Sequence, residues 1–225
     1  MNFNIEDLPN SSFNIVLAKR RSGKSYLTEY IVEQMKKNNQ VDCCFLFSGT
    51  GSGFERICPP DCRFDDIEIL DTILKNYQIF NQYNKQQPRE KLKIKIRSVI
   101  ILDDLAIDLK KKKFNIIEKL AVNGRHFAYA PLSLHFFILS QSLTKIPRVV
   151  RLNCDCIIFN QISSSNELQM IADENLYITS HSREAKHNAM KYYENIVNEP
   201  YSFCVIELFR NNIRELPDYI KKIKA

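Results

Sequence analysis

The eight residues from Ala18 to Ser25 have the types and spacing of a phosphate-binding loop. They read Ala-Lys-Arg-Arg-Ser-Gly-Lys-Ser, follow an apolar run and lead directly into a helix-like stretch. In such a loop, consecutive backbone N–H groups and the positive end of the helix dipole form a cavity for phosphates. Lys24 would add a positive charge at the β and γ positions, and the Ser25 hydroxyl would bind Mg²⁺. The residues predicted to bind the nucleotide are Arg20, Arg21, Ser22, Gly23, Lys24 and Ser25.

One position of this loop departs from the usual pattern. Ala18 stands where the pattern has its first glycine, so the turn must accommodate a Cβ atom. A chance Gly-Lys-Ser at the start of a helix is the alternative interpretation. The strand-like run before the loop and the helix-like stretch after it favour the phosphate-binding loop.

Two adjacent carboxylates form the second chemical motif. The apolar run that begins at Ser98 ends in Asp103 and Asp104. We expect Asp103 to hold the shell of a magnesium ion and Asp104 to polarise the water that attacks the γ-phosphate. Without the loop, a strand that ends in a solvated turn would be the better interpretation. Together the two motifs predict a P-loop nucleotide triphosphatase.

A third apolar run, Leu134 to Leu139, ends in the polar residues Ser140 and Gln141. Gln141 could sense the γ-phosphate, because the strand next to the acidic one in P-loop sheets often presents such a group. A capping turn made by the same two side chains is an equal alternative.

Arginines that could reach the nucleotide of a neighbouring subunit lie at Arg125, Arg148 and Arg151. Such an arginine neutralises charge in the transition state and raises the rate by orders of magnitude. An internal salt bridge is the alternative for each of them. Arg125 and Arg151 are retained as catalytic candidates, with Arg125 preferred.

The motifs lie in an alternation of strands and helices. Apolar, β-branched runs predict strands at Phe13–Ala18, Val41–Ser48, Ser98–Asp103, Leu134–Ser140, Cys154–Asn160 and Tyr201–Phe209. Apolar residues at helical spacing predict helices at Lys24–Lys37, Asp66–Tyr83, Lys113–Ala128, Ser165–Asp173 and Ser182–Asn195. This order predicts an α/β fold, a mainly parallel sheet with helices on both faces.

Length and composition limit the class of protein. The 225 residues, 44% hydrophobic and 26% charged, predict one folded domain over residues 1–225, with a core at about 13–209 and a short basic C-terminal tail. No apolar run approaches the roughly 20 residues that span a bilayer, and the first ten residues are not a secretory signal. The odd number of cysteines, seven, favours a reducing compartment, and the Cys58/Cys62 and Cys154/Cys156 pairs lack zinc-finger spacing. The net charge of +6 agrees with an anionic partner.

The order of these parts resembles the FtsK/HerA superfamily of DNA-pumping ATPases, and most closely the genome-packaging ATPases of large eukaryotic DNA viruses and virophages. The parts are the P-loop strand, an intervening strand, the Asp103–Asp104 strand, the Gln141 strand and the run Ile146 to Asp155. The similarity extends from about Phe13 to Phe209.

This resemblance implies several properties of the protein. It implies ATP as fuel with Mg²⁺, double-stranded DNA as cargo, a homo-oligomeric ring (pentamer or hexamer) and a capsid or portal protein as partner. It also implies a finger arginine that acts across the subunit interface, and a location in the virus factory of the host cytoplasm and in the virion.

Carried over by position, Lys24 and Ser25 match the phosphate and magnesium residues of the family, and Asp103 matches its metal acid. Asp104 matches the catalytic acid, where cellular relatives carry glutamate, and Gln141 matches the sensor.

Two other functions stay open at this point. The chain could be a nucleotide-gated assembly protein of the capsid vertex with little turnover, for which Ala18 and Asp104 leave room. It could also be a P-loop small-molecule kinase, although the sequence shows neither a lid nor an acceptor pocket.

Overall fold

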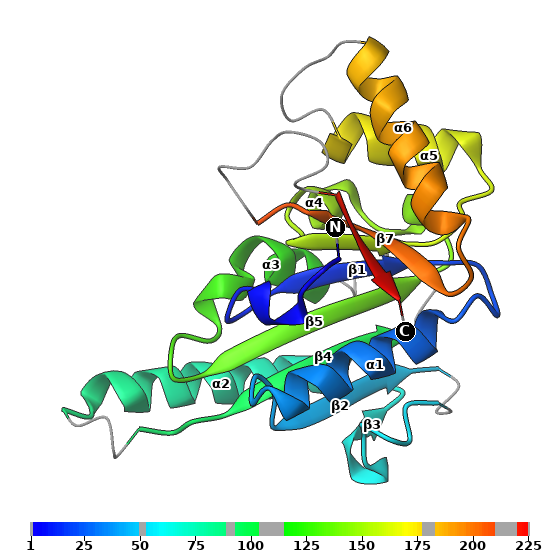
Figure 1. Ribbon diagram of the computed structural model, residues 1–225. Coiled ribbons are helices and arrows are strands. Elements are labelled where there is room, and N and C mark those ends of the chain that lie inside the picture. Colours follow the sequence, from blue (N-terminus) through cyan, green and yellow to red (C-terminus); the bar gives the residue numbers. More distant parts are fainter. Residues whose placement is uncertain are drawn as a thin grey trace.

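A mostly parallel sheet forms the centre of the protein (Figure 1). The computed structural model describes residues 2–49, 53–88, 93–103, 115–176, 183–209 and 220–224. Within these residues the sheet has eight strands in the order β3-β2-β4-β5-β1-β6-β7-β8. The strands are β1 (Phe13–Leu17), β2 (Cys43–Ser48), β3 (Arg63–Phe64), β4 (Arg97–Asp103), β5 (Ser133–Ser140), β6 (Cys156–Phe159), β7 (Ser202–Glu207) and β8 (Ile220–Lys224).

The central strands are apolar on both faces because both faces are covered. β1 and β5 are buried along their whole lengths. Ile15 of β1 lies between Ile138 of β5 and Ile157 of β6, in parallel register with both. β7 runs antiparallel to both β6 and β8, and the other strand pairs of the described residues are parallel. Such continuous apolar runs are typical of buried parallel strands.

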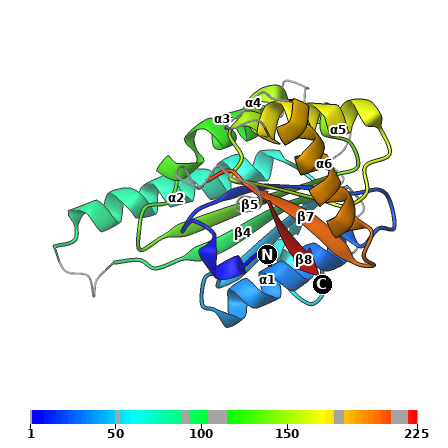
Figure 2. The same ribbon diagram turned by 45° about the horizontal axis from the view of Figure 1, so that its top comes forward.

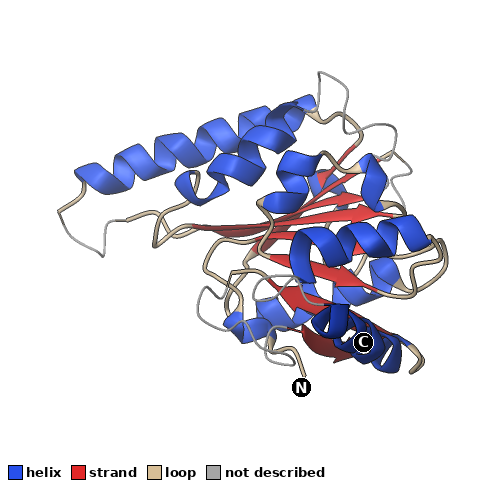
Figure 3. Cartoon of the chain, turned by 90° about the horizontal axis from the view of Figure 1, so that it is seen from above, coloured by secondary structure: helices blue, strands red, loops and turns tan. Residues whose placement is uncertain are grey.

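The helices form two layers, one on each face of the sheet, as Figures 2 and 3 show. On one face α1 (Lys24–Lys37) packs with the N-terminal segment through Leu27, Ile31 and Phe3. The other face carries α2 (Glu68–Gln86), α3 (Asn115–Asn123), α4 (Arg148–Leu152), α5 (Ser165–Ile171) and α6 (Arg183–Val197). Each layer buries its own apolar cluster against the sheet, which confirms the predicted α/β fold.

Most elements lie close to their predicted positions, and α1 has the predicted bounds. The third predicted helix is shorter than expected, because α3 ends at Asn123 and a 3-10 turn, Gly124–His126, follows. The basic C-terminal segment is not only a tail. Residues Ile220–Lys224 form β8, which pairs with β7 and buries Ile220 and Ile223.

No helix within the described part of the chain is long and apolar enough to cross a membrane.

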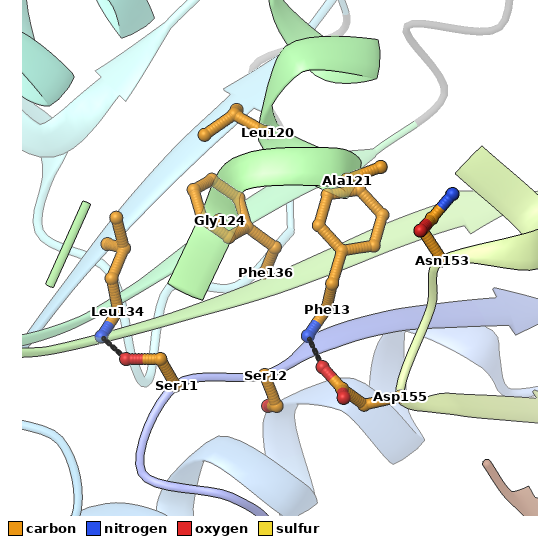
Figure 4. A pocket seen from close by; sticks show the side chains of 10 residues that line it. All are labelled: Ser11, Ser12, Phe13, Leu120, Ala121, Gly124, Leu134, Phe136, Asn153 and Asp155. Carbon is orange, nitrogen blue, oxygen red and sulfur yellow. Dashed lines mark hydrogen bonds between the residues drawn. The ribbon is translucent and has the colours of Figure 1, made fainter. Parts of the chain in front are cut away.

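The amino ends of β1, β5 and β6 are held together by buried polar groups (Figure 4). The Asp155 carboxylate accepts a hydrogen bond of 2.8 Å from the Phe13 backbone N–H, and the Ser11 hydroxyl oxygen accepts one of 3.2 Å from the Leu134 N–H. The rings of Phe13 and Phe136 stack beside them with centroids 5.6 Å apart. The cavity that these side chains line measures about 20 Å³, which is room for about one water molecule.

Candidate nucleotide-binding site

The predicted motifs meet at the carboxyl edge of the central strands. β5 lies between β1 and β4, so the loop after β1 and the acid at the end of β4 flank the end of β5. Leu17 pairs with Ser140, and Leu139 pairs with Asp103. In open α/β sheets this edge is where ligands bind.

The phosphate-binding loop is held by its own backbone. The Ala18 N–H donates to the Ser140 carbonyl at 3.2 Å, which ties the start of the loop to β5. The N–H and hydroxyl of Ser22 both donate to the Lys19 carbonyl, at 3.3 and 2.6 Å. These bonds close a tight turn directly before α1.

The loop requires a glycine at Gly23 and not at Ala18, the position that departs from the usual pattern. Among the described residues of the loop, Gly23 has φ of 87° and Arg21 has φ of 64°, both in the left-handed region. Ala18 lies outside that region and is 4% exposed. Its Cβ is therefore accommodated without backbone strain, and the alanine does not prevent the loop from forming.

Gly23 is also the N-cap residue of α1, and it has no side chain that could bond the first turn of the helix. The first N–H groups of a helix have no partner within the helix. With the dipole of a 14-residue helix behind them, this is the geometry that binds phosphate groups.

The two charged residues that the motifs predicted lie next to each other. Lys24 Nζ is 3.7 Å from Asp103 Oδ1, and both residues are 8% exposed. A cation and a carboxylate this well buried attract each other more strongly than an exposed pair, because water screens them little. Lys24 opens α1 and Asp103 ends β4, so two different elements build the pair.

The remaining candidates of the same edge lie as follows. Ser25 follows Lys24 in the first turn of α1 and is partly exposed, and Arg20 and Arg21 are exposed on the loop. Gln141 directly follows β5 and is exposed. Asp104 lies outside the described residues. Its role as catalytic acid stays a prediction, as does the sensor role of Gln141.

The two finger candidates lie away from this edge. Arg125 belongs to the 3-10 turn after α3, and its side chain is outside the described part of the structure. Arg151 on α4 is 6% exposed, and its guanidinium donates two hydrogen bonds, of 2.8 and 2.7 Å, to the Glu174 carboxylate. A third bond of 2.7 Å reaches the Ile146 carbonyl. Arg151 thus has the internal salt bridge that was the alternative interpretation for it.

Sequence reasoning missed one feature of the site, a cavity of about 770 Å³ beside the loop. Loop residues Arg21, Ser22 and Gly23 line it together with Tyr26 of α1 and with segments that follow β6 and precede β7. No local signal marks it, since its walls come from distant parts of the chain.

Comparisons with known proteins place the fold. No protein-family model matches the sequence. An uncharacterized protein of Acanthamoeba polyphaga mimivirus, L437, is 27% identical over 164 residues, and the match covers 70% of this chain and 55% of that protein.

Matches to solved structures cover more of this chain. The genome packaging NTPase B204 of Sulfolobus turreted icosahedral virus 2, in complex with ATP-gammaS, aligns with a TM-score of 0.59 at 15% identity, over 97% of this chain and 99% of that one. The chain has the fold of a viral genome-packaging NTPase. B204 of Sulfolobus turreted icosahedral virus, a DNA-packaging ATPase, aligns with a TM-score of 0.57 at 19% identity, over 96% and 99% of the two chains.

The conjugation coupling protein TcpA of pCW3, in its form with ATPgS, also shares this fold, with a TM-score of 0.57 at 15% identity over 96% of this chain and 60% of that one. Genome-packaging NTPases and a conjugation coupling protein thus share this fold, which confirms at the level of the fold the resemblance to FtsK/HerA-type ATPases.

Proposed function

We propose that the chain is a Mg²⁺-dependent ATPase that moves double-stranded DNA into a viral capsid. One observation carries this proposal. Lys24 Nζ and Asp103 Oδ1 lie 3.7 Å apart at the carboxyl edge of a sheet with the fold of the packaging NTPases. The first charge suits the phosphates of a nucleotide, and the second suits a cation bound to them.

The oxygen atoms at this edge fit a magnesium ion. Mg²⁺ prefers carboxylate, hydroxyl and phosphate oxygens, with several waters retained. Asp103 would offer its carboxylate from the end of β4, and Ser25 would offer its hydroxyl from the first turn of α1. When bound, the ion would neutralise charge on the β- and γ-phosphates.

The residues of the chain would then have separate tasks. The N–H groups of the loop and Lys24 hold the phosphates and withdraw negative charge from them. Asp104 orients the attacking water and takes its proton, and Gln141 contacts the γ-phosphate. Arg125 serves as the arginine that acts on a neighbouring subunit, because the Arg151 guanidinium is bonded to Glu174 within its own chain.

An arginine that acts between subunits requires an assembly. We therefore propose a ring of five or six copies that forms around DNA at a capsid or portal protein, in the virus factory of the host cytoplasm. Light scattering after size exclusion, with ATP analogue and double-stranded DNA present, measures the assembly. A species that remains monomeric during DNA-stimulated turnover would contradict the ring.

Steady-state ATP hydrolysis with Mg²⁺, with and without double-stranded DNA, tests the function itself. The wild type should be stimulated by DNA, and Lys24→Ala should lose about two to three orders of magnitude in turnover. Lys37→Ala is the matched control, because Lys37 is exposed at the other end of the same helix. It should hydrolyse ATP at the rate of the wild type.

The other outcomes separate the alternatives. Turnover that is indifferent to DNA would favour a small-molecule kinase and start a search for its acceptor. Tight binding of ATP without turnover would favour the vertex assembly protein. Stimulation by DNA that weakens steeply with rising salt would support a phosphate-dominated contact with DNA.

A further inference from the structure

The cavity beside the loop has the size and lining of a small-molecule site. Its volume is about 770 Å³, within the usual range for ligand pockets. One side of the cavity is formed by the loop and the first turn of α1. A second side is formed by Asn160 and Gln161, which follow β6, and a third by the range from Val197 to Tyr201, which connects α6 to β7.

Two tyrosines that line this cavity have largely exposed side chains. Tyr26 is 53% exposed and Tyr201 is 71% exposed. Tyr201 also has φ of 59°, a left-handed conformation that is costly for a bulky residue. Such an outlier in a cavity points to a functional constraint on the residue.

The Tyr26 ring is held from outside the cavity by an arginine. The Arg56 guanidinium lies 5.4 Å from the centre of the ring. The same guanidinium donates to Glu29 Oε2 at 2.8 Å and lies 3.5 Å from Glu33 Oε1, and both acids belong to α1. Arg56 comes from the segment after β2 and is not among the residues that line the cavity.

Polar side chains complete the lining. Asn160 donates to the Ser202 carbonyl at 3.1 Å, which fixes the segment after β6 against β7. Gln161 and Asn198 are exposed carboxamides, each with donors and an acceptor. An aromatic wall with a few amide groups suits a planar heterocycle with polar edges.

We propose that this cavity takes the base and ribose of the nucleoside triphosphate, with Tyr26 and Tyr201 as the stacking surfaces and Arg56 as the residue that positions Tyr26. This inference rests on the proposed function, in which the loop binds the triphosphate. The base is joined to the phosphates through the ribose and must lie beside the loop, and three loop residues line this cavity.

Calorimetric binding of a non-hydrolysable ATP analogue and of inorganic tripolyphosphate, each with Mg²⁺, tests the stacking surfaces. Tyr26→Ala and Tyr201→Ala should each lower the affinity for the ATP analogue by about fivefold or more and leave the affinity for tripolyphosphate unchanged. Tyr26→Phe, which keeps the ring, should bind as the wild type does. Tyr83→Ala removes a ring that is 42% exposed on α2 and serves as the matched control.

A double-mutant cycle tests the positioning role of Arg56. Arg56→Ala should lower the affinity for the ATP analogue by about two- to fivefold, because the contact with the Tyr26 ring is lost. The affinity for tripolyphosphate should again stay unchanged. In the Tyr26→Ala background the same substitution should have no further effect, because the ring that it positions is absent. A purely structural role of Arg56 would lower both affinities in both backgrounds.

The outcomes distinguish this inference from the proposed function. Unchanged affinity of the two tyrosine variants, with Lys24→Ala still inactive, would overturn the base pocket and leave the ATPase intact. An equal loss of both ligands, or a loss of DNA stimulation alone, would also overturn it. A wild type that binds neither ligand would overturn the proposed function and the pocket together.

Discussion

The two edges of the central sheet both bury ionisable groups, but these groups have different surroundings. At the amino edge, Asp155 accepts from a backbone N–H, and His135 Nδ1 lies 2.9 Å from the Ser12 hydroxyl. At the carboxyl edge, Lys24 and Asp103 lie beside a glycine-capped helix start. A cavity of about 770 Å³ adjoins that loop, and a cavity of about 450 Å³ lies beside Asp155 at the amino edge.

This difference shows that burial of a charged group does not by itself identify a functional site. Burial lowers the pKa of His135 to about 4, a large change for a side chain that lines neither of these cavities. Cavities and buried carboxylates occur at both edges, so what distinguishes the carboxyl edge is a glycine-capped helix start with a buried lysine–carboxylate pair beside it. The predictions below test this distinction, from the largest expected effect to the smallest.

The buried pair of Arg151, on the helix α4 that precedes β6, and Glu174 is predicted to stabilise the fold and not to take part in catalysis. Arg151→Ala should lower the free energy of unfolding by about 3–5 kcal/mol, because it leaves a mostly buried carboxylate without its partner. Arg148→Ala is the control, since Arg148 is 75% exposed and 3.7 Å from the same acid. Its effect should stay within about 0.5 kcal/mol in urea unfolding. Normal stability with lost turnover would instead make Arg151 the finger.

The same substitution at each edge should separate catalysis from stability. Asp103→Asn should lower turnover by about two to three orders of magnitude, because it removes the charge proposed to hold the metal. Asp155→Asn should leave turnover per folded molecule unchanged and lower the unfolding free energy by about 1–2 kcal/mol, through its weaker bond to the Phe13 N–H. Equal losses of turnover at both positions would remove the distinction between the edges.

Acid should destabilise the protein through His135. The folded pKa of about 4 lies below the ordinary value of 6.5, so protons bind more tightly to the unfolded chain. The stability due to neutral His135 is fully present above about pH 6.5 and falls by about 3 kcal/mol as the pH drops to 4. Urea unfolding across this range should show a shallower slope in His135→Asn, whatever the overall stability of that variant. Identical slopes would contradict the assignment.

The local parts of this protein could be predicted from the sequence with little error. The loop and α1 occupy adjacent residues, and α1 has the expected bounds from Lys24 to Lys37. Ile220–Lys224 was missed as a strand, because its buried residues Ile220 and Ile223 are three apart rather than two. Backbone pairing with β7 decides that segment, and pairing with a distant strand leaves no periodic signal.

The sequence by itself determined the phosphate-binding loop, the acid at the end of β4 and the alternation that makes an α/β fold. These depend on contiguous residues, whose conformation follows from local sterics and from burial on both faces. Only the tertiary structure decided that Lys24 meets Asp103, that Arg151 binds Glu174, and that Tyr26 and Tyr201 line one cavity. Each of these contacts joins elements that are far apart in the chain. The order of the strands in the sheet decides which of these elements lie next to each other in space.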